Sequence, residues 1–492
     1  MALVINTNVS SLTSQRALAE SKGELNTAME RLSTGLKINA ASDDAAGLAM
    51  TQRMTAQVRG LSMAVKNAND GIAMTKSVEG AIGEVSDMLQ RMRELAIQAA
   101  NGTNSSADRT FLQNEVNLLI QEITRVSTNT RYNGELILDG TFLNKQLQVG
   151  IEEGEVITMS VESIAAENIG AHTYVGNGQT ATAAAAAPAV NPTKVADDIE
   201  IFGFLGTKTV EASAEDTAKQ TATKINNLTG LTGVKAYAKT YAALSSANAT
   251  LQTYSVKING YSTGNFTISS GDVQDAVDAI NQISGSTGVT AHSESNKVVL
   301  FDSDGDDITV ENGQTLAGHD KLRVQKVDET GEVANVVGNL ISLAVSGGND
   351  STSVSGTLKM TSPNAFSIDG KSTTGYTGTT AGSTTATLKN LTQVNISTML
   401  QAGDSISIID AALDKVAQMR ANLGAIENRL DYTITNLMNI GERTADSRSR
   451  LQDADYALES SRLAKAQVIQ QAGTQMLSQA NQMTQLVLDL LR

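Results

Sequence analysis

The chain has 492 residues, of which 40% are hydrophobic but only 3% aromatic, and it has no tryptophan. A core of this composition is built from aliphatic side chains, which favours helix packing over a ligand pocket lined with rings. The 37 basic and 52 acidic residues give a net charge of −15, which argues against a nucleic-acid-binding protein because such a protein needs a basic surface. Cysteine is absent and the three histidines lie far apart, so no disulfide, metal, cofactor or catalytic site is expected.

Neither a membrane span nor a secretory signal is expected. No run of about 18 apolar residues occurs anywhere in the chain. Residues 1–7 lack the basic start and the long apolar stretch of a signal peptide. If the protein leaves the cell, it needs a different export route.

The first hundred residues have the pattern of long amphipathic helices. Apolar residues recur at Leu18, Leu25 and Leu32 on one helical face, up to a break at residues 39–44 where Ser and Asp can cap a new helix. A second apolar stripe runs from Met50 to Ala96 within a segment of about 55 residues, which is typical of a coiled coil rather than of a globular helix.

After the break at Asn101-Gly102, a third helix is expected at residues 106–128. The helical spacing of apolar residues then ends. Asn133-Gly134 and Asp139-Gly140 are turn dipeptides beside short apolar runs, a pattern that is typical of β-hairpins. Further strands are expected at 147–149 and 156–161. The N-terminal part therefore predicts a helical region followed by a β-hairpin region.

The middle of the chain, residues 171–401, is rich in Gly, Thr, Ser and Ala. The run Lys224-Ile-Asn-Asn, followed by Thr232-Gly-Val234, matches Ala279-Ile-Asn-Gln followed by Thr287-Gly-Val289. The match predicts a duplicated α+β unit near 201–240 and 258–295.

An acidic run lies within the second half of the middle region. The run Asp302-Ser-Asp-Gly-Asp-Asp307 has the ligand types of a calcium site but not the EF-hand register. The run is therefore interpreted as the acidic tip of a β-hairpin and not as a calcium site.

The C-terminal end again shows helical stripes, at residues 409–437 and 469–490. From Ala464 to the end, the only charged residues are Lys465, Asp489 and Arg492. A surface helix normally shows a charged face to water, so a helix of this kind predicts burial against other chains. Packing of two helices within one monomer is the alternative. Head-to-tail contacts that do not close into a ring produce an open helical filament.

The residues predicted to make these subunit contacts share positions on the apolar stripes of the two terminal helices. They are Leu18, Leu25, Leu32, Ile469, Met476, Met483, Val487 and Leu490.

Several motifs resemble bacterial flagellin, the protein of the flagellar filament. In the N-terminal part they are Leu32-Ser-Thr-Gly-Leu-Lys-Ile-Asn39, Ser42-Asp-Asp-Ala-Ala-Gly-Leu-Ala49, Gln90-Arg-Met-Arg-Glu-Leu-Ala96 and Arg131-Tyr-Asn-Gly134. In the C-terminal part they are Leu423-Gly-Ala-Ile-Glu-Asn-Arg-Leu430, Asp453-Ala-Asp-Tyr-Ala457, Gln470-Gln-Ala-Gly-Thr474 and Leu488-Asp-Leu-Leu-Arg492. The resemblance covers about half of the chain.

The resemblance implies a multi-domain fold that is mainly α at both termini, with long coiled-coil-like helices, a β-hairpin region and an inserted, β-rich α+β outer domain. Residues 1–42 would pair with 453–492 in an inner tube, and 43–170 with 402–452 in an outer tube. Residues 171–401 would form the variable outer domain.

The implied function is that of a structural subunit which polymerises into the extracellular flagellar filament for swimming, not that of an enzyme. The implied partners are further copies of the chain, a flagellar export chaperone, and the hook-associated and cap proteins. Export would use the flagellum's own type III apparatus. Toll-like receptor 5 is a further implied partner, with Arg91, Leu95 and Glu115 as the matching positions. A hook–filament junction adaptor and a secreted adhesin are the alternatives.

Overall fold

The computed structural model describes residues 8–181, 183–192, 198–213, 215–246, 251–269, 271–314, 321–328, 330–345, 348–370, 375–376 and 383–490, with side chains up to residue 482. The chain forms two compact units. Unit 1 comprises residues 1–76, 144–159 and 424–492, and unit 2 comprises 77–143 and 160–423. Two long helices, α2 (Ala45–Ala100) and α8 (Met399–Gln452), contribute residues to both units.

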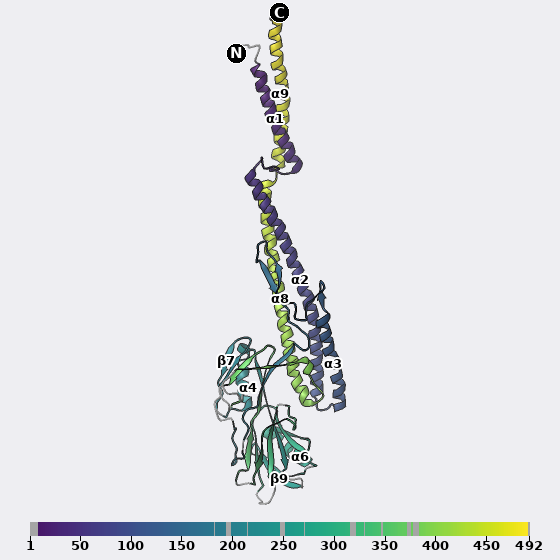
Figure 1. Ribbon diagram of the computed structural model, residues 1–492, viewed down its shortest axis with the longest axis vertical. Coiled ribbons are helices and arrows are strands. Elements are labelled where there is room, and N and C mark those ends of the chain that lie inside the picture. The colour runs from purple at the N-terminus through teal and green to yellow at the C-terminus, as the bar shows by residue number, and fades with distance from the viewer. Residues whose placement is uncertain are drawn as a thin grey trace. The chain divides into compact units, whose positions relative to one another are not determined.

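Unit 1 is a helical unit with one β-hairpin. Helix α1 (Val9–Thr34) lies beside α9 (Tyr456–Leu490), as Figure 1 shows. The side chain of Asn8 caps α1 by accepting a hydrogen bond from the Ser11 N–H, and the helix ends at Gly35 in the left-handed conformation. The hairpin is made of β3 (Lys145–Gln148) and β4 (Val156–Met159).

The hairpin of unit 1 packs on helices α2 and α8 through apolar side chains. Leu147 pairs with Ile157 across the hairpin, so both side chains lie on one face. That face contacts Leu430 of α8, which is fully buried together with Ala68 of α2. Residues from three distant parts of the sequence therefore share this small core.

The helical part of unit 2 contains the second half of α2, helix α3 (Ser106–Asn129) and the start of α8, with a short hairpin of β1 (Arg131–Tyr132) and β2 (Glu135–Leu136). Helix α3 begins with a capping box between Ser105 and Asp108. The residues of α2 that are buried here follow the three- and four-residue spacing predicted from the sequence: Val78, Ile82, Val85, Leu89, Met92 and Ala96.

The remainder of unit 2 is a β-rich region with short helices. Its strands are β5 (Gly170–Gly176), β6 (Ile199–Phe202), β7 (Thr207–Val210), β8 (Lys235–Ser246), β9 (Gln252–Ile258), β10 (Tyr261–Ile268), β11 (Val289–Glu294), β12 (Lys297–Asp302), β13 (Ile308–Asn312), β14 (Leu322–Val327), β15 (Val336–Leu343), β16 (Ser351–Val354), β17 (Thr357–Ser362), β18 (Ser367–Gly370), β19 (Ser383–Thr385) and β20 (Thr387–Asn390). Its helices are α4 (Ala218–Asn226), α5 (Thr229–Thr232), α6 (Gln274–Gln282), α7 (Ser284–Thr287) and the 3₁₀ helix η1 (Leu391–Gln393).

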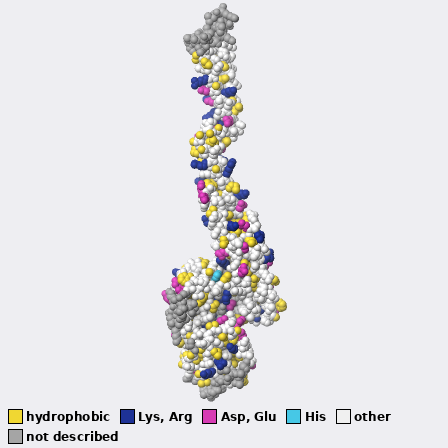
Figure 2. Space-filling model, viewed as in Figure 1, with side chains coloured by type: hydrophobic (Ala, Val, Ile, Leu, Met, Phe, Trp, Pro, Cys, Tyr) yellow, Lys and Arg dark blue, Asp and Glu magenta, His cyan; other side chains and the backbone are white. Residues whose placement is uncertain are grey.

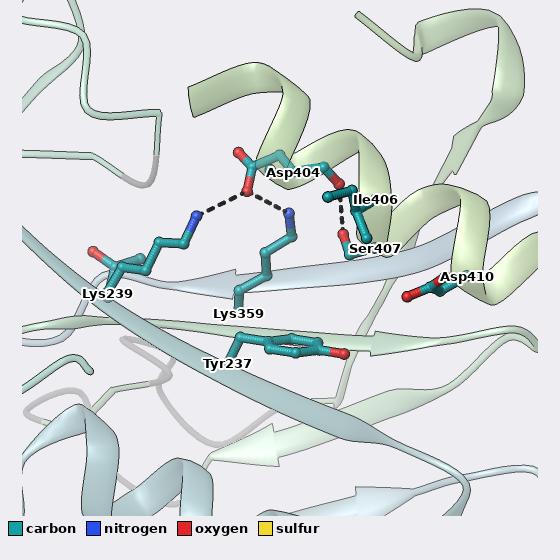
Figure 3. Close-up of a pocket in the computed structure, with 9 residues that line it drawn as sticks. Tyr237, Lys239, Lys359, Asp404, Ile406, Ser407 and Asp410 are labelled. Carbon is teal, nitrogen blue, oxygen red and sulfur yellow. Dashed lines mark hydrogen bonds and ion pairs between the residues drawn. The ribbon is translucent and has the colours of Figure 1, made fainter. Parts of the chain in front are cut away.

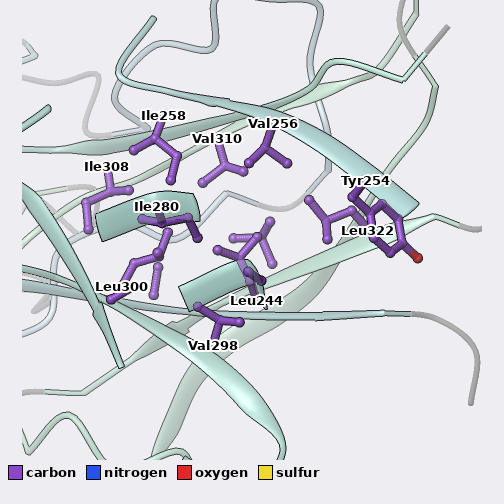
Figure 4. Close-up of a cluster of buried hydrophobic side chains, with 14 of the residues drawn as sticks. Leu244, Tyr254, Val256, Ile258, Ile280, Val298, Leu300, Ile308, Val310 and Leu322 are labelled. Carbon is purple, nitrogen blue, oxygen red and sulfur yellow. The ribbon is translucent and has the colours of Figure 1, made fainter. Parts of the chain in front are cut away.

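Strand β8 organises the largest sheet, whose order is β11-β12-β8-β17-β5-β20; β14 also pairs with β8, and β15 pairs with β14. A second sheet has the order β10-β9-β13-β16, and a third β19-β18-β6-β7. The main apolar core lies among β8, β9, β12, β13, β14 and α6 (Figure 4). Its central side chains are Leu244, Tyr254, Val256, Ile258, Ile280, Val298, Leu300, Ile308, Val310 and Leu322.

The two segments predicted as a duplicated unit have the same order of elements: two strands, a helix, a short helix and a strand. In the first segment, the Asn226 side chain bonds the main-chain N–H and C=O of Ala236. In the second, Asn281 makes the same two bonds to Ala291. Gly233 and Gly288, at the equivalent helix ends, both have a φ of 75°.

Candidate assembly surface

Helices α1 and α9 of unit 1 meet along one seam, which we define as those buried and half-buried residues that recur at alternating steps of three and four residues. Positions on both helices alternate between steps of three and four residues, the spacing of a coiled coil. The seam of α1 is Ser11, Ser14, Leu18, Ser21, Leu25, Ala28 and Leu32, and the seam of α9 is Glu459, Leu463, Ala466, Gln470, Gly473, Leu477 and Ala480.

Small and polar residues let the two helices approach closely along this seam. The Ser21 Oγ donates to the main-chain oxygen of Ala466 at 3.1 Å. A Cβ atom at Gly473 would lie 2.7 Å from the Leu18 Cδ1, so the glycine makes room for this leucine. At the other end of α1, an ion pair of 3.3 Å joins the Arg31 Nη1 to the buried Glu459 Oε1.

Outside the seam, the two helices expose large apolar side chains. Val468 is 65% exposed, Met476 is 60% exposed and Ile469 is 39% exposed. Helix α9 carries no charge between Lys465 and the last described side chain at 482. Hydrophobic side chains are visible on the surface of these helices in Figure 2. Such a surface is poorly suited to water and well suited to contact with other protein.

The structure divides the residues predicted for subunit contacts into three groups. Leu18, Leu25 and Leu32 are half-buried on the seam, whereas Ile469 and Met476 point away from it. The side chains of the last group, Met483, Val487 and Leu490, lie outside the described residues.

The small residues of the seam, such as Ser21 and Gly473, were not predicted, because they are not part of the apolar spacing on which the prediction rests. Extending the steps of three and four residues through the serines and the glycine would have identified the seam.

Arg91 and Glu115 form an exposed polar cluster in unit 2. The Arg91 Nε lies 2.9 Å from the Glu115 Oε1, and its Nη1 lies 3.0 Å from the Glu94 Oε2. Hydrogen bonds to Glu94 and Glu115 raise the pKa of Arg91. Leu95 is only 1% exposed, so its side chain packs inside the helical bundle and supports the helix that presents Arg91.

Two aspartates of the acidic run at 302–307 form ion pairs with one lysine of the same unit. The Lys219 Nζ lies 3.0 Å from the Asp304 Oδ2 and 2.8 Å from the Asp306 Oδ2, and these hydrogen bonds raise the pKa of Lys219. Among the residues that the structure describes, no group of His, Asp or Glu side chains could hold a metal ion.

A cavity of about 170 Å³ in unit 2 lies between β8, β17 and the start of α8 (Figure 3). The Nζ atoms of Lys239 and Lys359 both donate to the Asp404 Oδ1, at 3.4 and 3.3 Å. Tyr237, Ser407 and Asp410 are the other labelled polar residues of the lining. The Asp404 carboxylate thus forms an ion pair with each of the two lysines that line the cavity.

Comparison with known proteins decides the family. The bacterial flagellin N-terminal helical region matches residues 5–143, and the C-terminal helical region matches residues 406–491. The chain is 37% identical to the B-type flagellin of Pseudomonas aeruginosa, over the whole length of both chains. The chain belongs to the bacterial flagellin family. The flagellin of Salmonella typhimurium is 34% identical, again over the whole length of both chains.

A solved structure of FliC from Burkholderia pseudomallei matches 73% of this flagellin and 99% of its own chain, with 18% sequence identity and a TM-score of 0.30. Family membership confirms the predicted function: the protein is a structural subunit of the flagellar filament. The predicted fold class, with helical termini around an inserted β-rich region, is also confirmed. Of the helices in the described ranges, none is long and apolar enough to cross a bilayer.

Proposed function

We propose that this flagellin polymerises through the outward faces of α1 and α9, while the seam between the two helices holds each subunit's termini together. The observation that carries the proposal is the exposure of Val468, Ile469 and Met476 on a helix segment without charge. Burial of apolar surface stabilises a contact by about 25 cal/mol per Å², so a repeated contact of this kind favours a long polymer. Met483, Val487 and Leu490 would extend the same contact.

The test is a change of the outward face that leaves the seam intact. The double variant Ile469→Asp, Met476→Asp is expected to abolish filament growth from short seeds, because each contact would then bury an unpaired carboxylate. Growth is measured by sedimentation and electron microscopy.

The control for this test is Met476→Leu, which keeps the side chain apolar and should retain assembly. Circular dichroism of the unassembled chains must agree between the variants, so that loss of growth is not loss of folding. Filaments from the double variant in parental yield would contradict the proposal.

The free subunit is further proposed to present Arg91 and Glu115 to Toll-like receptor 5, with Leu95 as internal support. The exposed ion pair of 2.9 Å and the burial of Leu95 support these separate roles. Arg91→Ala and Glu115→Ala should each weaken binding to the receptor ectodomain by about tenfold, corresponding to the loss of one favourable polar contact.

Arg420→Ala provides a matched control for the receptor test, because Arg420 forms an exposed ion pair of 3.3 Å with Glu79 in the same unit. This variant should bind like the parent. Parental affinity in both Arg91→Ala and Glu115→Ala would refute the receptor proposal.

Export is proposed to follow the flagellum's own route, without a cleaved signal peptide, to an extracellular filament. A cytoplasmic export chaperone would cover the apolar face of α9 before assembly, and the hook-associated and cap proteins would meet the same terminal helices. The absence of cysteine and the charge-free segment after Lys465 support this proposal. Loss of chaperone capture by a chain that ends at Leu463 is the test of this contact.

A further inference from the structure

The cavity of about 170 Å³ in unit 2 lies between one face of the β8–β17 strand pair and the first turns of α8. Across the two strands, Lys239 pairs with Thr357 and Tyr237 pairs with Lys359. Paired residues point to the same face of a sheet, and residues two apart on a strand do so as well. These four side chains therefore form one block, which lines the cavity opposite Asp404 of α8.

The two lysines of this block share one carboxylate oxygen, as Figure 3 shows. The distances from the Lys239 Nζ and the Lys359 Nζ to the Asp404 Oδ1 are 3.4 and 3.3 Å, whereas a hydrogen bond between an ammonium and a carboxylate is ordinarily about 2.7–2.9 Å long. In the part of unit 2 that the structure describes, neither amine donates to another acceptor. An ammonium has three N–H donors, so each lysine retains donors for a further acceptor.

The charges that line the cavity leave one positive charge without a matching carboxylate. The other acidic residue of the lining, Asp410, is already paired with Arg93 of α2. Two lysines therefore face the single carboxylate of Asp404. The shortage matters most at Lys359, whose side chain is only 9% exposed, because bulk water cannot supply the acceptors that a buried ammonium needs.

A buried hydroxyl group of the same lining has no partner. Thr357 is only 2% exposed, and no described residue forms a hydrogen bond with its Oγ1. Buried polar side chains in folded proteins nearly always form a hydrogen bond, and a hydroxyl group can donate one to an anion. The unpartnered Thr357 hydroxyl and the two lysines thus line one cavity with donors that lack acceptors.

We propose that this cavity binds a small organic carboxylate with an apolar ring, of the size of benzoate. The ligand carboxylate accepts hydrogen bonds from Lys239, Lys359 and the Thr357 hydroxyl, and its charge matches the unpaired positive charge. Its ring lies against the apolar surfaces of Tyr237 and Ile406, which also line the cavity. The volume of about 170 Å³ suits one such ring, since a cavity of about 150 Å³ holds benzene.

The charge of the cavity favours a monoanion over other ligands. A neutral ring would leave the two ammonium groups short of acceptors, and a dianion would add a second negative charge close to the Asp404 carboxylate. The competing interpretation is purely structural: the two lysines and Asp404 join the sheet to α8, and the cavity binds no anion. The two interpretations differ in whether a small carboxylate binds saturably, which a titration can measure without any assay of assembly.

The experiment is a ligand-observed NMR titration of the unassembled full chain with benzoate, beside benzamide as an uncharged analogue of the same shape. Benzoate is expected to saturate its site below about 10 mM, and benzamide to bind at least about tenfold more weakly because it lacks the charge. Lys359→Met should abolish benzoate binding. Thr357→Val keeps the shape of the side chain and should weaken binding about tenfold without lowering the unfolding temperature, because the hydroxyl has no partner to lose.

Lys257→Met is the matched control, because Lys257 forms an ion pair of 2.7 Å with Glu311 in the same unit but does not line the cavity. This variant should bind benzoate like the parent. A parent chain that shows no saturation below about 10 mM would overturn the proposal, and this measurement does not depend on the folding of any variant. Equal binding of benzoate and benzamide would overturn the assignment to a carboxylate. Parental affinity in both Lys359→Met and Thr357→Val would overturn the assignment to this cavity.

Discussion

A chain ending at Leu463 is expected to stay unpolymerised under conditions in which the full chain grows long filaments from seeds. The truncation removes the α9 seam from Ala466 to Ala480 and the exposed apolar side chains beyond it. It also leaves Leu18 and Leu25 of α1 without their partner helix. A single amphipathic helix of 26 residues has little stability in water on its own, so α1 would lose order as well.

Sedimentation and electron microscopy would measure this loss of assembly. A chain ending at Leu490 serves as the control, since it keeps the whole of α9, and should polymerise. Long tubes from the chain ending at Leu463 would show that α9 is dispensable. The same truncation should abolish capture of the export chaperone, whereas the chain ending at Leu490 should retain it.

Leu430→Ala is expected to destabilise unit 1 by about 2–5 kcal/mol, the range measured for large-to-small changes in cores. Leu430 is fully buried and contacts both α2 and the β3–β4 hairpin, through Ala68 and Ile157. If the hairpin moved to fill the resulting cavity, it would lose its contact with α2, and if α2 moved, it would lose its contact with the hairpin. Guanidinium unfolding of the unassembled chain, followed by circular dichroism, measures the change.

Met438→Ala provides the comparison for this prediction, because Met438 lies on the same helix but is 61% exposed. Its effect on the free energy of unfolding should be within about 0.5 kcal/mol. If the two variants unfold at the same denaturant concentration, the packing of Leu430 against the hairpin does not stabilise unit 1, and the prediction is wrong.

The long helices could be predicted because their signals are local. The Asn101-Gly102 break predicts the end of α2 at Ala100, and the apolar spacing predicts α3 within one residue of its observed ends. The face that α9 turns to α1 was not predicted, since Leu477 lies on the seam while Met476 points outward. In a helix without charges, neighbouring apolar stripes look alike, and only the partner helix distinguishes them.

The β-rich region was predictable in its short strands but not in its sheets. The pairing of β8 with β12, β14 and β17 joins distant segments, and such long-range pairing leaves no local signal.

The ends of the β-rich region are hydrogen-bonded neighbours, since β5 and β20 pair from Gly170 with Asn390 to Thr173 with Thr387. The chain therefore enters and leaves this region at almost the same point. A segment inserted or exchanged between these strands can leave the β5–β20 pair itself in place. The region between 177 and 386 can therefore change in length or sequence while its two ends stay joined to each other by this strand pair.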